Sequence, residues 1–146
     1  MSAIAFENTS FKQKDPTGWI QQPIDPSATY VFLASVASKQ KLPVLVALSY
    51  DKKVDNTDAF LESSLKKGFT NVKKLKLQKS KKLSLKIPHS FYEVSYVEEG
   101  DLYKGYALLI PQKNKYHLFQ FTCGSANFDV FSKDVLEVFN STILKN

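Results

Sequence analysis

The fold is decided between Val72 and Cys123 by five segments: VKKLKL (72–77), LSLKI (83–87), YEVSYV (92–97), LYKGYALLI (102–110) and YHLFQFTC (116–123). Apolar and polar residues alternate along most of them, which is the period of a β-strand with one buried face. The connections between the segments are too short for parallel crossovers. This stretch therefore predicts an antiparallel meander, and its first two segments are expected to form a hairpin.

Further strands and two helices are predicted around the meander. Residues 28–38 are rich in β-branched and aromatic side chains, and the near-continuous apolar run at 43–50 is typical of a central strand buried on both faces. A helix is predicted over 55–68, with capping residues at its start, lysines in its last turn and Gly68 at the C′ position. A second is predicted over 127–144, where an apolar stripe recurs at helical spacing. This order of elements indicates a layered α+β domain.

The length and composition fit one folded domain. A chain of 146 residues that is 43% hydrophobic can bury a core without disulfide or metal. Residues 1–9 are expected to be a flexible leader, and residues 10–146 a single domain. No apolar run is long enough for a membrane helix, and residues 1–6 lack the features of a signal peptide. We expect an extracytoplasmic location, in a bacterial envelope and in a mature form without its signal, with a cytoplasmic location as the alternative.

The basic residues of the chain are all lysines. There are 20 of them, the net charge is +6, and arginine is absent. Arginine is the usual residue for bidentate recognition of phosphate and guanine, so a specific nucleic-acid partner is not expected. On the predicted hairpin Lys74, Lys76, Lys82 and Lys86 share the outer face and form a positive patch for an acidic partner. The alternative, which we favour, is that these lysines keep an exposed sheet edge soluble and unpaired.

Two single residues have special positions. Trp19 follows the turn at 15–18 and is expected to plug one end of the core, with contact to a partner or ligand as the alternative. It joins the four lysines as a candidate partner-binding residue. Gly105 lies inside a predicted strand and is expected to mark a bulge or a close backbone approach.

No catalytic, metal-binding or cofactor-binding residue is predicted. Neither His89 nor His117 has histidine or cysteine neighbours at ligand spacing, so both are interpreted as surface or packing residues. Cys123 has no local signature of a nucleophile and is interpreted as a core cysteine. The acidic turn at 98–101 does not match a calcium-binding loop and is expected to be a solvated hairpin tip. We therefore expect a protein that is not an enzyme and needs no cofactor.

The order of elements resembles that of PsbP-like domains. The opening FKQKDPTGW (11–19) is similar to the start of such domains, and the helix DAFLESSLKKG (58–68), the meander and the final helix ending FNS (139–141) continue the likeness. The resemblance implies an α-β-α sandwich with a central twisted antiparallel sheet, here of about six strands, and two main helices. Members of this superfamily are mostly non-enzymatic. They include photosystem II extrinsic subunits, DcrB-like envelope lipoproteins, Ran-binding Mog-type proteins and Eag-type chaperones of secretion effectors.

The resemblance implies a non-catalytic protein-interaction module, acting as an accessory subunit, adaptor or chaperone. Its partner would be another protein, with weak contact to an acidic surface. No binding motif of any branch maps onto this chain, so no functional residue is carried over. The alternative is a carrier or sensor of a small apolar ligand in a pocket between sheet and helix. The aromatic residues proposed to open into that pocket are Tyr30, Phe32, Tyr92, Tyr96, Tyr106, Phe119 and Phe121.

Overall fold

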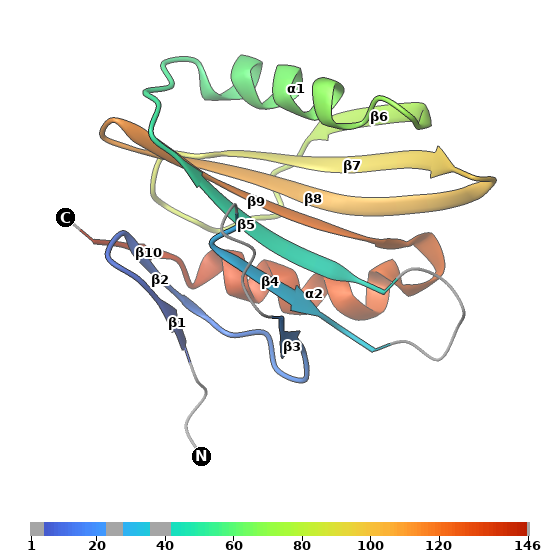
Figure 1. Ribbon diagram of the computed structural model, residues 1–146, viewed down its shortest axis with the longest axis horizontal. Coiled ribbons are helices and arrows are strands. Elements are labelled where there is room, and N and C mark those ends of the chain that lie inside the picture. The colour runs from blue at the N-terminus through green and yellow to red at the C-terminus, as the bar shows by residue number, and fades with distance from the viewer. Residues whose placement is uncertain (1–4, 23–27, 36–41, 146) are drawn as a thin grey trace.

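The computed structural model describes residues 5–22, 28–35 and 42–145. The strands of its main sheet are β3 (Ile20–Gln21), β4 (Tyr30–Leu33), β5 (Val44–Tyr50), β6 (Lys73–Lys79), β7 (Ser90–Glu98), β8 (Asp101–Gln112) and β9 (Lys115–Gly124). Within the described residues they form a seven-stranded antiparallel sheet in the order β3-β4-β5-β9-β8-β7-β6. Helix α1 (Thr57–Gly68) covers one face, and helix α2 (Phe128–Asn140), after the short turn η1 (Ser125–Asn127), covers the other (Figure 1). The predicted α-β-α sandwich is confirmed, with one strand more than expected in this sheet.

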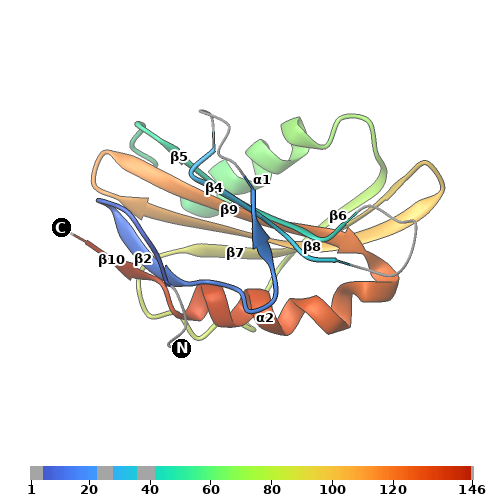
Figure 2. The same cartoon turned by 60° about the horizontal axis from the view of Figure 1, so that its bottom comes forward.

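A second, small sheet ties the two ends of the described chain together. It contains β1 (Ala5–Glu7), β2 (Phe11–Lys14) and β10 (Ile143–Leu144), in the order β1-β2-β10. It lies on the same side of the main sheet as α2 (Figure 2). Residues 5–7 therefore form a paired strand, where a flexible leader was expected for residues 1–9. Residues 1–4 lie outside the described residues.

The central strands β8 and β9 are buried on both faces. Along β8, Tyr106, Leu108 and Ile110 point into the cluster under α2, while Ala107 and Leu109 point into the cluster under α1. All five are almost completely buried. This explains why residues 106–110 of β8 are apolar without interruption instead of alternating.

The ends of both helices differ slightly from their predicted positions. Asn56 caps α1 as expected, because its side-chain oxygen accepts a hydrogen bond from the Ala59 amide at 3.1 Å. Gly68 is the last helical residue, and the C-cap is Phe69, so the glycine is not at C′. Helix α2 ends at Asn140, before its predicted end, because the following residues continue into β10 and pair with β2.

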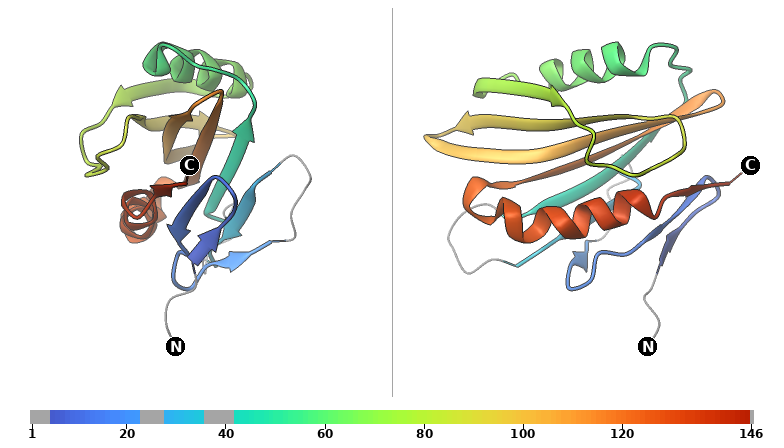
Figure 3. Two further views of the ribbon diagram at one scale, coloured as in Figure 1. Left: turned by 90° about the vertical axis from the view of Figure 1, so that its left-hand side faces the viewer. Right: turned by 180° about the vertical axis from the view of Figure 1, so that it is seen from behind.

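The hairpin predicted from residues 72–77 and 83–87 is wrong. Strand β6 pairs with β7, and residues 80–89 contain no strand. Leu83, Leu85 and Ile87 pack instead against the cluster under α2, and the Ser84 amide donates a hydrogen bond to Asn140 Oδ1 at 2.8 Å. The segment passes from the sheet edge toward α2 (Figure 3). An extended loop with one buried side shows the same alternation of apolar and polar residues as a strand. The sequence pattern therefore cannot distinguish the two.

Gly105 allows a close backbone approach, as its position predicted. A Cβ atom built there would lie 1.8 Å from the backbone oxygen of Phe121 on β9. We expect Gly105→Ala to lower the free energy of unfolding by about 3 kcal/mol or more, since a backbone atom in a paired strand cannot move aside. Chemical denaturation of the purified protein measures the change.

Gly68→Ala is the matched control for this substitution. Nothing lies within 4 Å of a Cβ at Gly68, so the same chemical change is expected to stabilise the protein by up to about 1 kcal/mol. A Gly105→Ala variant as stable as the parent protein would contradict the observed register of β8 and β9.

Candidate functional site

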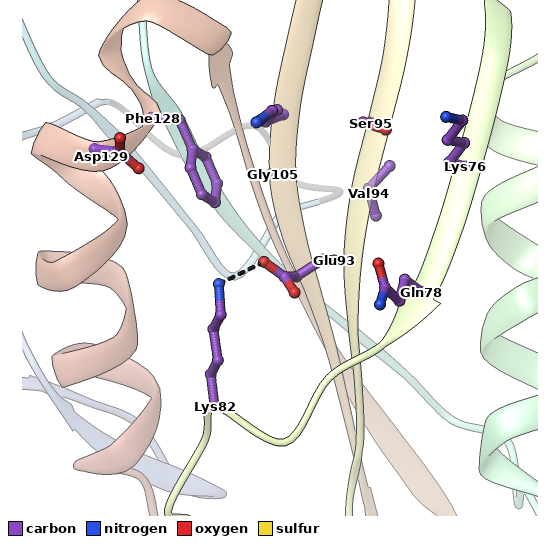
Figure 4. A pocket seen from close by; sticks show the side chains of 10 residues that line it. Lys76, Gln78, Lys82, Glu93, Val94, Ser95, Gly105, Phe128 and Asp129 are labelled. Carbon is purple, nitrogen blue, oxygen red and sulfur yellow. Dashed lines mark hydrogen bonds and ion pairs between the residues drawn. The ribbon is translucent and has the colours of Figure 1, made fainter.

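A polar groove lies on the α2 face of the sheet, between the start of α2 and the edge strand β6 (Figure 4). Its volume is about 320 Å³. Helix α2 packs over β8, β9 and the small-sheet strand β2, and the outer strands of the main sheet extend beyond it. The groove therefore occupies a part of the sheet face that the helix layer leaves open.

The floor of the groove is a row of polar side chains across three strands. Lys76 on β6 is the register partner of Ser95 on β7, and Ser95 is the register partner of Lys104 on β8. A second row begins with Gln78 and Glu93, which are also register partners. Because neighbouring strands are about 4.8 Å apart, the backbones at Lys76 and Lys104 are separated by about 10 Å, with Ser95 between them.

The wall beside α2 carries both signs of charge. Lys82, from the loop after β6, forms an ion pair with Glu93 at 2.9 Å (Figure 4). The hydrogen bond from the Lys82 ammonium to this carboxylate raises the pKa of Lys82. Phe128 and Asp129 come from the first turn of α2, and the Lys104 ammonium lies 5.9 Å from the centre of the Phe128 ring.

The groove has an excess of positive charge. Lys76, Lys82 and Lys104 face two carboxylates, Glu93 and Asp129. Within the described residues Lys82 is paired with Glu93, whereas Lys76 and Lys104 take part in no ion pair. The groove can therefore accept one further negative charge near Lys76 and Lys104.

The structure brings together only part of the predicted lysine patch. Lys76 and Lys82 line the groove, whereas Lys74 lies at the irregularity in β6, with a backbone φ of 55°, and Lys86 is exposed on the 80–89 loop. Because the predicted hairpin does not exist, the four lysines do not share one face. Lys104 was missed, although a single lysine in an otherwise apolar central segment is a signal that could have identified it.

Trp19 belongs to the core. Only 9% of its surface is exposed, and its ring lies 6.0 Å from that of Phe121 and 5.7 Å from that of Phe131. The indole N–H points to Asp134 Oδ2 at 3.5 Å. The expectation that Trp19 plugs one end of the core is confirmed, and the burial of its ring leaves little surface for a partner.

His117 is a buried packing residue with both ring nitrogens engaged. Nδ1 lies 2.7 Å from the Ser49 hydroxyl and Nε2 lies 2.8 Å from Gln112 Oε1. Since the amide oxygen can only accept, Nε2 carries the proton, and Nδ1 accepts from Ser49. Burial, reinforced by the charge of Lys115, lowers the pKa of His117 to about 4.

The thiol of Cys123, the other candidate catalytic group, is also in the core. Cys123 is 2% exposed, and burial raises the pKa of its thiol to about 11, so the thiolate is disfavoured. The interpretation of Cys123 as a core cysteine is confirmed. Among residues 5–22, 28–35 and 42–145, no group of three or more histidine, cysteine or acidic side chains is placed to hold a metal ion.

The aromatic residues named for an apolar pocket do not surround one cavity. They are buried in two clusters on opposite faces of the sheet. Tyr92 and Tyr96 lie under α1. The others lie under α2: Tyr30, Phe32, Tyr106, Phe119 and Phe121. The seven side chains therefore fill two cores instead of opening into one pocket.

Comparisons with known proteins identify the fold. No protein-family model and no curated protein matches the sequence. Among solved structures, the chain is similar to LpqN of Mycobacterium tuberculosis, a protein involved in cell envelope biogenesis, with a TM-score of 0.69 and 14% identity over 93% of this chain and 83% of LpqN. It is similar to the cyanobacterial PsbP of Synechocystis, with a TM-score of 0.67 and 12% identity over 98% of this chain and 92% of the other.

The same arrangement occurs in Mog1p, a Ran-binding protein of Saccharomyces cerevisiae. The TM-score is 0.68 and the identity 9%, over 98% of this chain and 96% of Mog1p. The chain has the PsbP-like fold. At these identities the likeness concerns the PsbP-like fold and not the partners of its individual members. No helix among the described residues is long and apolar enough to cross a membrane.

The burial of His117 predicts a loss of stability in acid. Its folded-state pKa of about 4 is below the ordinary value of 6.5, so between these values the unfolded chain takes up a proton that the folded protein does not. His117 therefore does not change the free energy of unfolding above pH 6.5. As the pH decreases toward 4, its protonation in the unfolded chain lowers the free energy of unfolding by about 3 kcal/mol in total. Denaturant titrations across this range measure the slope.

A His117→Gln variant serves as the comparison, because acidic residues also titrate at the low end of the range. The variant is expected to be less stable at neutral pH but to lose less stability between pH 6.5 and pH 4 than the parent protein. The same loss in both proteins would show that His117 does not carry the effect.

Proposed function

We propose that this protein is a non-catalytic protein-interaction module that binds its partner through the polar groove and the adjoining edge of β6. The observation that supports this most directly is Lys104. It lies on β8, two strands inside the sheet edge, and its side chain lines an open groove on a sheet face that is otherwise buried. Lys104 is exposed to solvent and does not lie on the edge of the sheet.

The alternative explanation, protection of the sheet edge, accounts for only some of the lysines. Charged side chains and irregularities on an edge strand prevent it from pairing with other chains. Lys73, Lys74 and Lys79 on β6 fit that role. Ser95 on β7 and Lys104 on β8 are not on the edge, so their place in the groove needs another reason.

The edge of β6 offers a second means of contact. This strand ends the seven-stranded sheet, and its pairing with β7 is regular from Lys76 to Lys79. An extended segment of a partner can add to such an edge through backbone hydrogen bonds, with alternate side chains reaching one face. The partner's side chains on the α2 face would then stand beside Lys76, at the rim of the groove.

The chemistry of the remaining residues favours a non-catalytic role. Both ring nitrogens of His117 are taken by structural hydrogen bonds, and the Cys123 thiol is buried. The Ran-binding protein Mog1p shares the fold, which supports a protein as the partner. The role of the module as an accessory subunit, adaptor or chaperone is a prediction, and so is its location outside the cytoplasm. Fractionation of source cells tests the location.

Site-directed cross-linking tests the proposed surface. The buried Cys123 leaves an introduced surface cysteine as the reactive thiol, so Gln78→Cys, an exposed position that lines the groove, can be labelled with a photoactivatable maleimide. We expect a native extract to yield a protein adduct at Gln78→Cys that is absent from Ser63→Cys, an exposed position on α1 over the opposite face. Mass spectrometry identifies the adduct.

Binding of the purified partner then completes the test. Lys104→Gln is expected to weaken it about 5- to 10-fold, because a charge at the contact is removed. Identical adducts at both cysteine positions, or a purified partner that binds Lys104→Gln as tightly as the parent protein, would contradict the proposed surface.

A further inference from the structure

We propose that the groove recognises an acidic segment of the partner, with one aspartate or glutamate side chain held over Ser95 between Lys76 and Lys104. This inference rests on the proposed function and specifies the chemistry of the partner. It depends on the arrangement of the floor, where the three side chains are consecutive register partners on β6, β7 and β8.

The three floor residues form a site for a carboxylate. Because direct register partners project from the same face, both ammonium groups and the Ser95 hydroxyl lie on the groove side. Ser95 is half-buried, and within the described part of the chain neither lysine is neutralised by an acidic side chain. A carboxylate above Ser95 accepts from all three donors, and these charge-assisted hydrogen bonds are stronger than neutral ones.

The other charges of the groove limit how much negative charge it can accept. Lys82 and Glu93 neutralise each other, and Asp129 offsets part of the charge of Lys76 and Lys104. One carboxylate therefore balances the groove. A nucleic acid, which carries a charge on every phosphate, would place further negative charges beside Glu93 and Asp129, and the chain has no arginine to hold them.

The adjoining strand edge favours a peptide over a free anion or a lipid headgroup. The regular part of β6, Lys76–Lys79, begins at one of the two lysines that hold the carboxylate. A segment paired with this edge lies about 10 Å from Ser95, beyond the reach of a glutamate side chain, so the acidic residue comes from the adjoining part of the peptide, where its backbone crosses over β6 into the groove. The recognised segment is thus expected to be extended, with an acidic residue at a position facing the groove.

Titration of the isotope-labelled full chain with a defined peptide tests the inference. The probe is an acetylated and amidated octapeptide of alternating Glu and Thr, and its counterpart of alternating Gln and Thr is the control. We expect the acidic peptide to shift the amide resonances of Lys76, Ser95 and Lys104 and to bind about 10-fold more tightly than the neutral one. The affinity is expected to fall as salt is raised, since the lysines are accessible to solvent.

Matched variants assign the effect to the floor of the groove. Lys76→Gln and Lys104→Gln are each expected to weaken the acidic peptide about 5-fold, and Ser95→Ala about 3-fold. Lys86→Gln, which removes the same charge from the exposed 80–89 loop, is expected to leave the affinity within about 2-fold. Unchanged amide spectra of the free variants show that each is folded.

Several results would overturn the inference. They are no binding of the acidic peptide, equal binding of the neutral peptide, or equal weakening by Lys86→Gln and Lys76→Gln. Tighter binding of a single-stranded oligonucleotide or of phosphatidylglycerol vesicles, with the same dependence on Lys76 and Lys104, would also overturn it in favour of a phosphate ligand. A cross-linked partner at Gln78→Cys without peptide binding would refute this inference and leave the proposed function standing. Peptide binding without any cross-linked partner would contradict the proposed function, and with it the claim that the acidic segment belongs to a partner protein.

Discussion

The structure depends on the pairing of β8 with β9. These two strands are the longest of the sheet, and every residue of β8 from Gly105 to Ile110 is buried. A strand buried on both faces needs a covering layer on each side, and α1 and α2 supply those layers. The pair also requires a glycine, because the backbone of β9 occupies the space that a Cβ at position 105 would fill. The two helix layers and the two core clusters follow from the burial of this central pair on both faces.

The polar groove exists because the two helices cover different strands of the main sheet. Helix α1 packs over β7 and β8, whereas α2 packs over β8 and β9 and against the small sheet. The two helices are therefore offset, and on the α2 face the outer strands carry lysine, glutamate and serine where a covered strand would carry leucine or phenylalanine. The groove is the direct consequence, and its positive excess gives the proposed surface a defined chemistry.

Polar groups inside the molecule serve to connect its parts. His117 joins β5 to the end of β8 through Ser49 and Gln112, and the Gln112 amide in turn donates to the backbone oxygens of Ser10 and Lys145 near the small sheet. Each of these groups is satisfied, as buried polar groups must be to avoid a large cost in stability. His117 is part of this network, and Cys123 is buried in the core.

The sequence by itself determined the α+β class, the antiparallel meander from β7 to β9, both helices, and the core roles of Trp19 and Cys123. Local signals are sufficient there, because periodicity, capping residues and tight turns act over a few neighbouring positions. Only the tertiary structure decided that residues 80–89 form a loop, that β10 joins β2, and that Lys104 stands beside Lys76. These features depend on which face of the sheet a helix covers and on pairing between distant segments. The position of a lysine along the chain does not show whether a helix covers that part of the sheet.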